Sequence, residues 1–298
     1  MINIGITGGE TVAAGELVRL LINHPDVNLK WVSARGLSGK LSACHKGLLG
    51  ECDVEFSSPS VADVDLVFSC DSDASLFENV SEEVKATMRI VDFGHSITNV
   101  EPCMYGLCEI NRKFMVHDCY GVVRLPSSQA MLLLLALIPA AKNGMLNGSI
   151  YSHFDLGAMI KIADEVDLNA EVGDVIKALQ PNFDGAIEIT RGSHSSKRGM
   201  VVSATMPCNL DSGSVKAIYR DYYGDHNFTF VSDEAVDMSD VMNTNKCLIN
   251  IEVTDGMLHI TAFADGLLKG AAGNAVHVMN LLFGFHEKVG LALKAQVF

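Results

Sequence analysis

The chain has 298 residues, a length comfortable for two domains, and it carries a formal net charge of −14 at pH 7. Hydrophobic residues make up 48% and charged residues 19%, a balance typical of globular proteins. The negative charge repels phosphate backbones and anionic lipid surfaces, so neither nucleic acid nor membrane is an expected partner. An anionic small-molecule substrate would have to be held by a few local cations or backbone donors.

The first four residues lead directly into an apolar strand, with no basic segment and no apolar stretch of signal-peptide length, which predicts a cytoplasmic protein. The longest apolar run, residues 130–141, is interrupted by Pro139 and is shorter than the ~20 residues that span a bilayer. It is predicted to be a buried helix. Eight cysteines without a Cys-x-x-Cys pair are predicted to be reduced thiols, and no metal site is implied.

A glycine turn opens the chain. A short strand is predicted over residues 2–6, and a helix over residues 15–22 follows the turn. Such a turn lets the backbone approach a pyrophosphate, and the helix N-terminus supplies unpaired N–H groups. The predicted contacts are Gly5, Thr7, Gly8 and Gly9. Many unrelated chains carry a tight glycine turn, so a purely structural turn remains the alternative.

The second predicted strand, residues 29–33, ends at the position that determines whether a nucleotide-binding fold prefers NAD or NADP. Ser33 and Arg35 stand there in place of an acid. An acid would bind the ribose hydroxyls of NAD, whereas serine and arginine can hold the 2′-phosphate of NADP. The sequence therefore favours NADP as the cofactor. The alternative is that Arg35 is only a solvated loop residue.

Further strands are predicted over residues 65–69 and 89–93, with a helical segment over residues 81–88. This alternation predicts an α/β domain of the Rossmann type, a doubly wound parallel sheet with helices on both faces. Ligands of such sheets lie at the carboxyl ends of the strands, so the residues after Phe68 and Phe93 are expected to border the site.

The pattern changes to longer alternating strands between residues 149 and 263. Strands are predicted over residues 200–206, 247–253 and 258–263, and Thr254-Asp255-Gly256 is a hairpin signal. This pattern predicts a second, α+β domain with a mixed or antiparallel sheet. One face of that sheet must be buried against something.

Three motifs occur along the chain in the following order: Gly5-Ile6-Thr7-Gly8, the Tyr-Gly-Leu-Cys-Glu-Ile-Asn-Arg segment at residues 105–112, and the glycine- and alanine-rich segment at residues 269–280. Residues 16–25 and 38–40 and the pair Arg198-Gly199 fall in the same order. Together they resemble N-acetyl-γ-glutamyl-phosphate reductase, an arginine-biosynthesis relative of aspartate-semialdehyde dehydrogenase. The resemblance runs along most of the chain.

The resemblance implies a dinucleotide-binding domain over residues 1–127, completed by a C-terminal helix at about 270–298, and a catalytic and dimerisation domain over residues 128–269. It implies NADPH-dependent reduction of an acyl phosphate to a semialdehyde, and a homodimer or homotetramer. Gly273 and Asn280 would lie near the nicotinamide, although a simple packing helix explains that segment equally well. The first glycine loop is about three residues longer than in the family, around residues 10–14.

In the family, a cysteine thiolate expels phosphate and forms a thioester, which then accepts hydride. Its cysteine lies in an Asn-Pro-Gly-Cys-Tyr turn, and counting from both sides aligns that turn with Pro126-Ser127-Ser128, so Ser128 takes the cysteine position. An alkyl ester is a much poorer hydride acceptor than a thioester. A rival alignment uses Cys119 as the nucleophile, and a structural alternative makes Ser128 a helix N-cap.

Two other expected groups are missing. The family's histidine base precedes a stretch that best matches Ala170-Glu171-Val172, where no histidine occurs, and His153 and His194 are the nearby imidazoles. An arginine expected after the Asp92-Phe93 strand is also absent, since the chain continues Gly94-His95-Ser96. A basic segment offers anion-binding candidates in Arg191, Lys197 and Arg198, although a basic loop is usually just solvated.

Three functions follow as hypotheses. The first is an NADP-dependent reductase of N-acetyl-γ-glutamyl phosphate in arginine biosynthesis. The second is a non-catalytic NADP- or metabolite-binding paralogue, or a regulatory partner of an active enzyme. The third is an acyl hydrolase in which Ser128 attacks and water replaces hydride, which needs a base that the sequence does not supply.

Overall fold

The computed structural model describes the chain except for residues 79, 95–96, 98–99, 117–119, 161–166 and 296–298. By its internal contacts the chain divides into two units. The first unit comprises Met1–Pro126 and Ala271–Ala292, and the second comprises Ser127–Gly270 and Leu293–Phe298. In the part of the chain that the structure describes, no helix has both the length and the apolar character that a bilayer crossing demands.

The first unit is built on a parallel six-stranded sheet with the order β2-β1-β3-β4-β6-β5. Its strands are β1 (Ile2–Thr7), β2 (Val27–Val32), β3 (Leu66–Ser69), β4 (Arg89–Asp92), β5 (Cys103–Tyr105) and β6 (Gly121–Arg124). Every residue of β3 is buried, as expected for a parallel strand covered on both faces. The predicted Rossmann-type sheet is confirmed.

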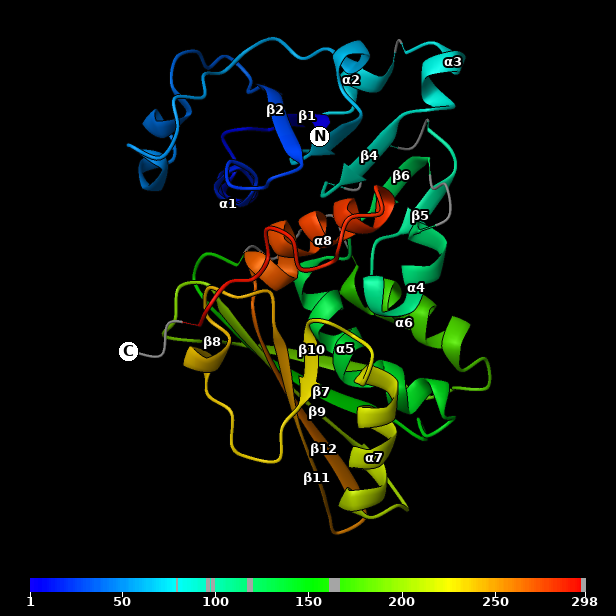
Figure 1. The fold of residues 1–298 in the computed structure, drawn as a ribbon. Coiled ribbons are helices and arrows are strands. Elements are labelled where there is room, and N and C mark those ends of the chain that lie inside the picture. The colour runs from blue at the N-terminus through cyan, green and yellow to red at the C-terminus, as the bar shows by residue number, and fades with distance from the viewer. Residues whose placement is uncertain (79, 95–96, 98–99, 117–119, 161–166, 296–298) are drawn as a thin grey trace. The chain divides into compact units, whose positions relative to one another are not determined.

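Helices cover both faces of this sheet. On one face, α8 (Gly273–Leu282) contacts both α1 (Val12–Leu21) and α4 (Cys108–Met115) (Figure 1). On the other face, Phe77 of α2 (Ser75–Glu78) packs with Trp31, Val67 and Ile90, near α3 (Glu82–Lys85) in the chain. A five-residue π-helix, Leu268–Ala272, precedes α8, so the helix predicted from about residue 270 starts in the π form and becomes α-helical at Gly273.

The second unit is built on a mixed sheet with the order β10-β11-β12-β9-β7-β8. Its strands are β7 (Ile150–Leu156), β8 (Ile187–Ser193), β9 (Gly199–Pro207), β10 (Thr229–Val231), β11 (Cys247–Thr254) and β12 (Met257–Asp265). The pairs β11–β12, β12–β9 and β9–β7 are antiparallel, and the outer pairs β10–β11 and β7–β8 are parallel. The predicted hairpin is confirmed: Asp255 and Gly256 both have positive φ, and Thr254 pairs with Met257.

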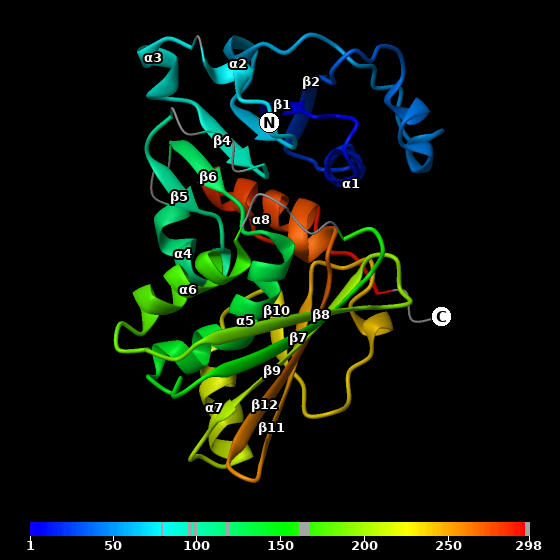
Figure 2. The same ribbon diagram turned by 180° about the vertical axis from the view of Figure 1, so that it is seen from behind.

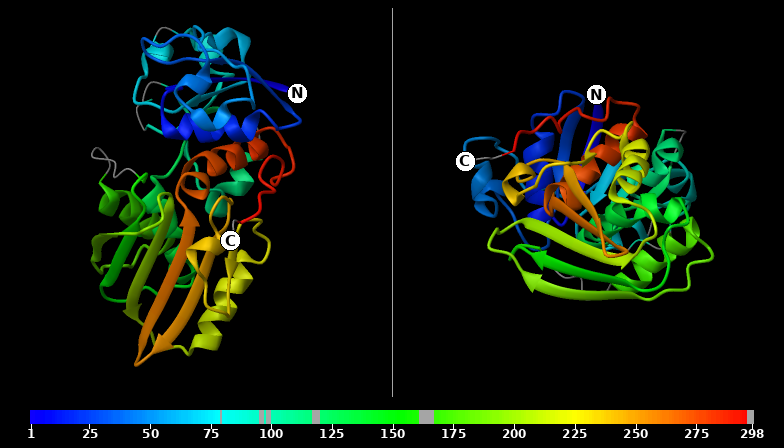
Figure 3. Two further views of the ribbon diagram at one scale, coloured as in Figure 1. Left: turned by 90° about the vertical axis from the view of Figure 1, so that its left-hand side faces the viewer. Right: turned by 90° about the horizontal axis from the view of Figure 1, so that it is seen from below.

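Three helices cover one face of the second sheet: α5 (Ser128–Lys142), α6 (Leu168–Leu179) and α7 (Ser212–Tyr223) (Figure 2). Buried and more exposed residues alternate along the strands, as they do in β7. Figure 3 shows the yellow helix α7 alongside the orange strands β11 and β12. The opposite face of the sheet carries Tyr151, His153, Ser203 and His259, all of them exposed.

Helix α5 continues through Pro139, and a tyrosine explains how. Proline has no N–H, so the carbonyl of Leu135 loses its partner within the helix. The Tyr223 hydroxyl of α7 donates to that carbonyl at 2.6 Å, and the Tyr219 hydroxyl donates to the carbonyl of Ala136, also at 2.6 Å. The proline break in the apolar run is therefore compensated by α7.

Removing the Tyr223 hydroxyl should reveal this compensation. Tyr223→Phe is expected to lower the free energy of unfolding by about 1–3 kcal/mol, because a buried carbonyl loses its donor. Urea denaturation measures the change. The matched control is Tyr223→Phe combined with Pro139→Ala, since alanine at 139 restores an N–H for the Leu135 carbonyl. The cost of the missing hydroxyl should then shrink, and an equal cost in both backgrounds would contradict the explanation.

Candidate functional site

The glycine turn after β1 is formed by backbone conformation. Gly8 has a φ of +64°, and a Cβ there would lie 2.7 Å from the Cβ of Asp71. Both facts require glycine at this position. Gly5 is glycine for a different reason: a Cβ on it would lie 2.1 Å from the indole of Trp31. Gly5 therefore serves packing in this structure, while Gly8 forms the turn.

The lengthened loop ends in an available helix N-terminus. Helix α1 begins at Val12, three residues earlier than predicted, and the Thr11 hydroxyl caps it by accepting the Ala14 N–H at 3.2 Å. Among the described residues, no partner is found for the N–H groups of Glu10, Val12 and Ala13. Unpaired donors at the start of a helix favour a phosphate group. The loop therefore fits a pyrophosphate.

His45 fixes this loop, and the sequence did not predict it. Its Nε2 lies 2.7 Å from the carbonyl oxygen of Gly9. The ring also lies against the helix at Gly15, where a Cβ would come within 2.4 Å of Nδ1. The Gly9 N–H donates to the Ser33 carbonyl at 2.8 Å, so Gly9 contributes to the loop's shape rather than an unpaired donor. A glycine inside the helix at position 15 was the available signal of a close approach.

A pocket of about 280 Å³ lies at the carboxyl ends of the first strands. Thr7, Gly8, Ser33 and Arg35 line it, so four of the predicted cofactor contacts are brought together. Asp71 and Asp73, which follow β3, line it as well and were not predicted. Their position directly after a buried strand was the signal that could have identified them. The residues fit the phosphate and ribose groups of a nucleotide.

The two aspartates differ in electrostatic environment. Burial is the main effect that raises the pKa of the Asp71 carboxyl, which accepts a hydrogen bond from Thr7 Oγ1 at 3.1 Å. Hydrogen bonds from Ser75, with a further contribution from Arg35, lower the pKa of Asp73 to about 2. Arg35 forms an ion pair with Asp73 at 2.6 Å. The predicted phosphate anchor is therefore already in contact with a carboxylate.

Asn280 of α8 is fully buried, and its amide is bound within the first unit. Its Nδ2 donates to the carbonyls of Glu287 at 3.1 Å and Val289 at 2.9 Å, and its Oδ1 lies 3.1 Å from His24 Nε2. Burial lowers the pKa of His24. These contacts use both amide hydrogens and the oxygen, so they give Asn280 a structural role. Gly273 is buried as the first residue of α8.

Ser128 is the first residue of α5 and does not cap it. The N-cap is Ser127, whose Oγ accepts the Ala130 N–H at 3.2 Å, so the cap predicted at Ser128 is wrong by one residue. Ser127 has the extended backbone of a cap, with ψ of 149°. The Ser128 hydroxyl instead lies 3.0 Å from the Gly270 carbonyl and 3.4 Å from that of Gly266. Cys119, the rival nucleophile, lies outside the described residues.

The carboxylate beside the start of α5 accepts hydrogen bonds from Ser127 rather than from Ser128. Glu171 of α6 accepts the Ser127 N–H at 3.0 Å and the Ser127 hydroxyl at 2.7 Å. A carbonyl oxygen cannot take a proton from the Ser128 hydroxyl, and a serine nucleophile needs a base that can. Within the described part of the chain, Ser128 thus has a donor's role toward backbone carbonyls.

The predicted anion-binding residues are engaged separately. Arg198 forms an ion pair with the fully buried Asp265 at 2.7 Å, and burial raises the pKa of that carboxyl despite the arginine. Arg191, on β8, is exposed, and its Nε lies 3.4 Å from the Oε1 of Gln129, the residue after Ser128. Lys197 is exposed. Arg191 and Lys197 thus remain the candidates for an anionic substrate.

The two imidazoles near this segment have local partners. His153 Nδ1 lies 2.8 Å from Thr190 Oγ1, and its Nε2 lies 3.5 Å from Asp155. His194 Nδ1 accepts the N–H of Ser196 at 2.9 Å. Neither contact involves Ser128, so the described residues give no geometric support for either histidine as its base.

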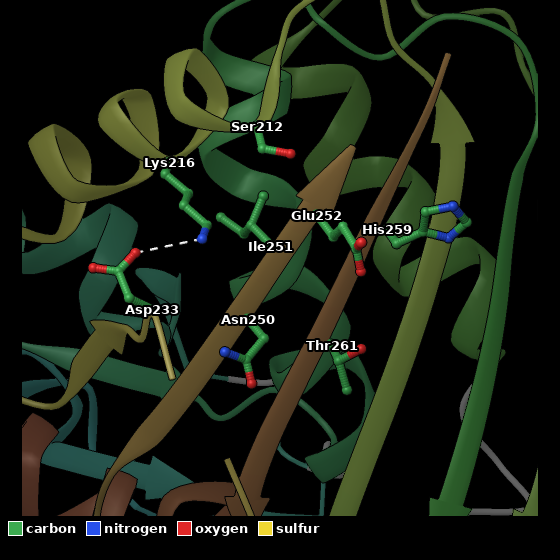
Figure 4. A pocket seen from close by; sticks show the side chains of 8 residues that line it. All are labelled: Ser212, Lys216, Asp233, Asn250, Ile251, Glu252, His259 and Thr261. Carbon is green, nitrogen blue, oxygen red and sulfur yellow. Dashed lines mark hydrogen bonds and ion pairs between the residues drawn. The ribbon is translucent and has the colours of Figure 1, made fainter. Parts of the chain in front are cut away.

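A second pocket, of about 380 Å³, lies beside β11 and β12 in the second unit (Figure 4). Its cation, Lys216, lies 3.4 Å from the carboxylate of Asp233, and Glu252 of β11 and His259 of β12 also line the pocket. None of the predicted site residues lines this pocket. Of these two pockets, the nucleotide pocket is therefore the one that agrees with the sequence motifs.

The chain is similar to known proteins along its whole length. The sequence model of the semialdehyde dehydrogenase NAD binding domain matches residues 3–117, and that of the semialdehyde dehydrogenase dimerisation domain matches residues 169–265. The N-acetyl-gamma-glutamyl-phosphate reductases of Parabacteroides distasonis and Christiangramia forsetii are each 34% identical over 325 aligned positions. These alignments cover 100% of both chains.

Solved structures share the fold at low sequence identity. Aspartate semialdehyde dehydrogenase II from Vibrio cholerae has a TM-score of 0.72 at 12% identity, covering 95% of this chain and 98% of that one. The Candida albicans aspartate semialdehyde dehydrogenase, solved with NADP, has a TM-score of 0.70 at 12% identity, with the same coverage. By its full-length relatives and both domain matches, this chain belongs to the N-acetyl-γ-glutamyl-phosphate reductase family of the semialdehyde dehydrogenases.

Proposed function

We propose that this chain binds NADP and an acyl-phosphate ligand, and that it performs its family's reduction only at a residual rate. The inherited reaction is the NADPH-dependent conversion of N-acetyl-γ-glutamyl phosphate to the semialdehyde, in arginine biosynthesis, as the names of the full-length relatives suggest. The observation that carries the proposal is the hydroxyl of Ser128, which the sequence predicts at the position of the family's thiol and which contacts the Gly270 carbonyl at 3.0 Å.

The nucleotide would be held by residues of the first unit. The N-terminus of α1 and the turn at Gly8 suit the pyrophosphate, while Ser33 and Arg35 suit the 2′-phosphate. When bound, the reduced dinucleotide supplies hydride. An anionic substrate would be held by exposed cations such as Arg191 and Lys197 of the second unit.

This chain is least suited to the chemical step of the reaction. A thiol has an ordinary pKa of about 8.5 and ionises readily, and its thioester is a good hydride acceptor. A serine hydroxyl has neither advantage, and the contacts of His153 and His194 give it no base. Loss of members of a catalytic unit costs several powers of ten in rate, or more than about 4 kcal/mol of transition-state stabilisation. Binding does not depend on either group.

The acyl hydrolase is less well supported than the binding role. It needs the Ser128 proton to pass to a base, and the hydroxyl contacts carbonyl oxygens. A non-catalytic paralogue or a regulatory partner of an active enzyme needs no such transfer. We further propose a homodimer or homotetramer formed through the exposed face of the second sheet, since residues 169–265 match a dimerisation domain.

The direct test combines binding with turnover. Calorimetry should detect NADP binding, while absorbance of reduced nicotinamide should change at least about a thousandfold more slowly than at ordinary enzyme rates of roughly 1–1,000 per second. N-acetyl-γ-glutamyl phosphate with NADPH is the forward assay, and the semialdehyde with NADP and phosphate is the reverse. Turnover at ordinary rates would refute the residual-rate proposal.

Arg35→Ala tests the nucleotide assignment separately. We expect it to weaken NADP binding about tenfold, because the 2′-phosphate loses its cation, and to leave NAD binding unchanged. Calorimetry with both nucleotides measures this. Arg19→Ala is a matched control, because Arg19 is paired with Glu16 on the same unit and does not line the pocket. Equal losses for both nucleotides would remove the assigned role.

A further inference from the structure

The arginine that would anchor a 2′-phosphate is held across the nucleotide pocket. Its Nη2 lies 2.6 Å and its Nε 2.9 Å from Oδ2 of Asp73. Arg35 follows β2 and Asp73 follows β3, and these two strands lie on either side of β1 in the sheet. The ion pair therefore spans the end of the strand that leads into the glycine turn.

Asp73 is a fixed partner in this pair. Its Oδ1 accepts the Ser75 N–H at 2.9 Å at the start of α2, and its side chain is 26% exposed, against 72% for Arg35. With a pKa of about 2, the Asp73 carboxylate stays charged at any physiological pH. The more exposed partner is thus the arginine, and a phosphate that binds it must compete with Asp73. Asp71 adds a second carboxylate to the lining of the same pocket.

We propose that Asp73 determines nucleotide specificity by holding Arg35 and repelling a 2′-phosphate, so that the site discriminates between NADP and NAD less than Ser33 and Arg35 alone would dictate. The proposal rests on the nucleotide binding proposed above. A phosphate next to a carboxylate is repelled at short range, whereas a ribose hydroxyl can donate a hydrogen bond to it. Asp73 therefore opposes NADP and tolerates NAD.

Asp73→Asn is the sharpest test, because asparagine can keep the oxygen that accepts the Ser75 N–H while an uncharged NH2 group replaces the oxygen that binds Arg35. The dissociation constants of NADP and NAD are measured by calorimetry at moderate salt. NADP should bind about tenfold more tightly and NAD no more tightly than to the wild type. Asp53→Asn is the matched control: it frees Lys40 from a 2.6 Å ion pair with the same change in charge, outside the pocket.

According to the proposal, the gain in NADP affinity on Asp73→Asn depends on Arg35. In an Arg35→Ala background, Asp73→Asn should improve NADP binding less than about threefold, because no cation remains to be released. The proposal is overturned if Asp73→Asn changes the NADP-to-NAD ratio less than about twofold while the wild type binds NADP, or if Asp53→Asn gives the same gain. If neither the wild type nor Asp73→Asn binds either nucleotide, the nucleotide function itself is wrong, and this inference falls with it.

Discussion

Replacing Ser128 with cysteine should raise the rate of phosphate release from N-acetyl-γ-glutamyl phosphate by at least about a hundredfold. The new thiol would occupy the first residue of α5, where the positive end of the helix dipole favours a thiolate. It would also lack the strong hydrogen bond that the hydroxyl now donates to the Gly270 carbonyl. Inorganic phosphate is measured with and without NADPH, so that acyl transfer and reduction are separated.

Ser127→Cys is the matched control for this variant. It places the same thiol one residue earlier, at the N-cap beside the Glu171 carboxylate, which disfavours the thiolate. We expect no gain from it. A gain in Ser127→Cys without one in Ser128→Cys would place the nucleophile elsewhere and contradict the alignment. Because the described residues offer no base to Ser128, NADPH oxidation by Ser128→Cys should remain below ordinary enzyme rates.

Arg198→Met should lower the free energy of unfolding by about 3–5 kcal/mol near neutral pH. Asp265 is fully buried and accepts the N–H groups of Asn243, Leu267 and Leu268 at 2.8 to 3.1 Å, but Arg198 is the cation paired with it. Removing one partner of a buried pair leaves an uncompensated charge. Arg191→Met, at an exposed arginine on β8, is the control and should cost less than about 0.5 kcal/mol.

The effect of Arg198→Met should depend on pH in a defined direction. Burial raises the pKa of Asp265 in the folded state, so the unfolded state loses its proton first as pH rises. Stability therefore falls as pH rises from the unfolded pKa to the folded one. Without Arg198 the folded pKa moves higher, and the loss relative to wild type should be larger at pH 7.5 than at pH 5. An equal loss at both values, measured by urea denaturation, would contradict this account.

The elements of the fold could be predicted because their signals are local. Strand alternation identified β9, β11 and β12, and the turn residues Asp255 and Gly256 fixed the hairpin between the last two. The end of α1 was also predicted, but its start was not. The helix begins early, at Val12, because Thr11 supplies a cap that the periodicity of apolar residues does not contain.

The candidate site was only partly predictable, because several of its contacts join distant parts of the chain. Thr7, Gly8, Ser33 and Arg35 gather in one pocket, as a nucleotide fold requires. The pairing of Arg35 with Asp73 spans 38 residues, and that of His24 with Asn280 spans 256. No spacing pattern reveals such partners. They matter here because Asp73 changes what Arg35 can do, and because its partners give Asn280 a structural role.

The proposed exchange of sulfur for oxygen at the attacking position is tested most directly by a single-turnover experiment. The wild-type protein, in excess over N-acetyl-γ-glutamyl phosphate and without NADPH, is followed for phosphate release and for the mass of the intact chain. We predict phosphate release far slower than ordinary enzyme turnover and no accumulation of acylated protein. A rapid release of about one phosphate per bound substrate, with the acyl group mapped to Ser128 or Cys119, would contradict the account.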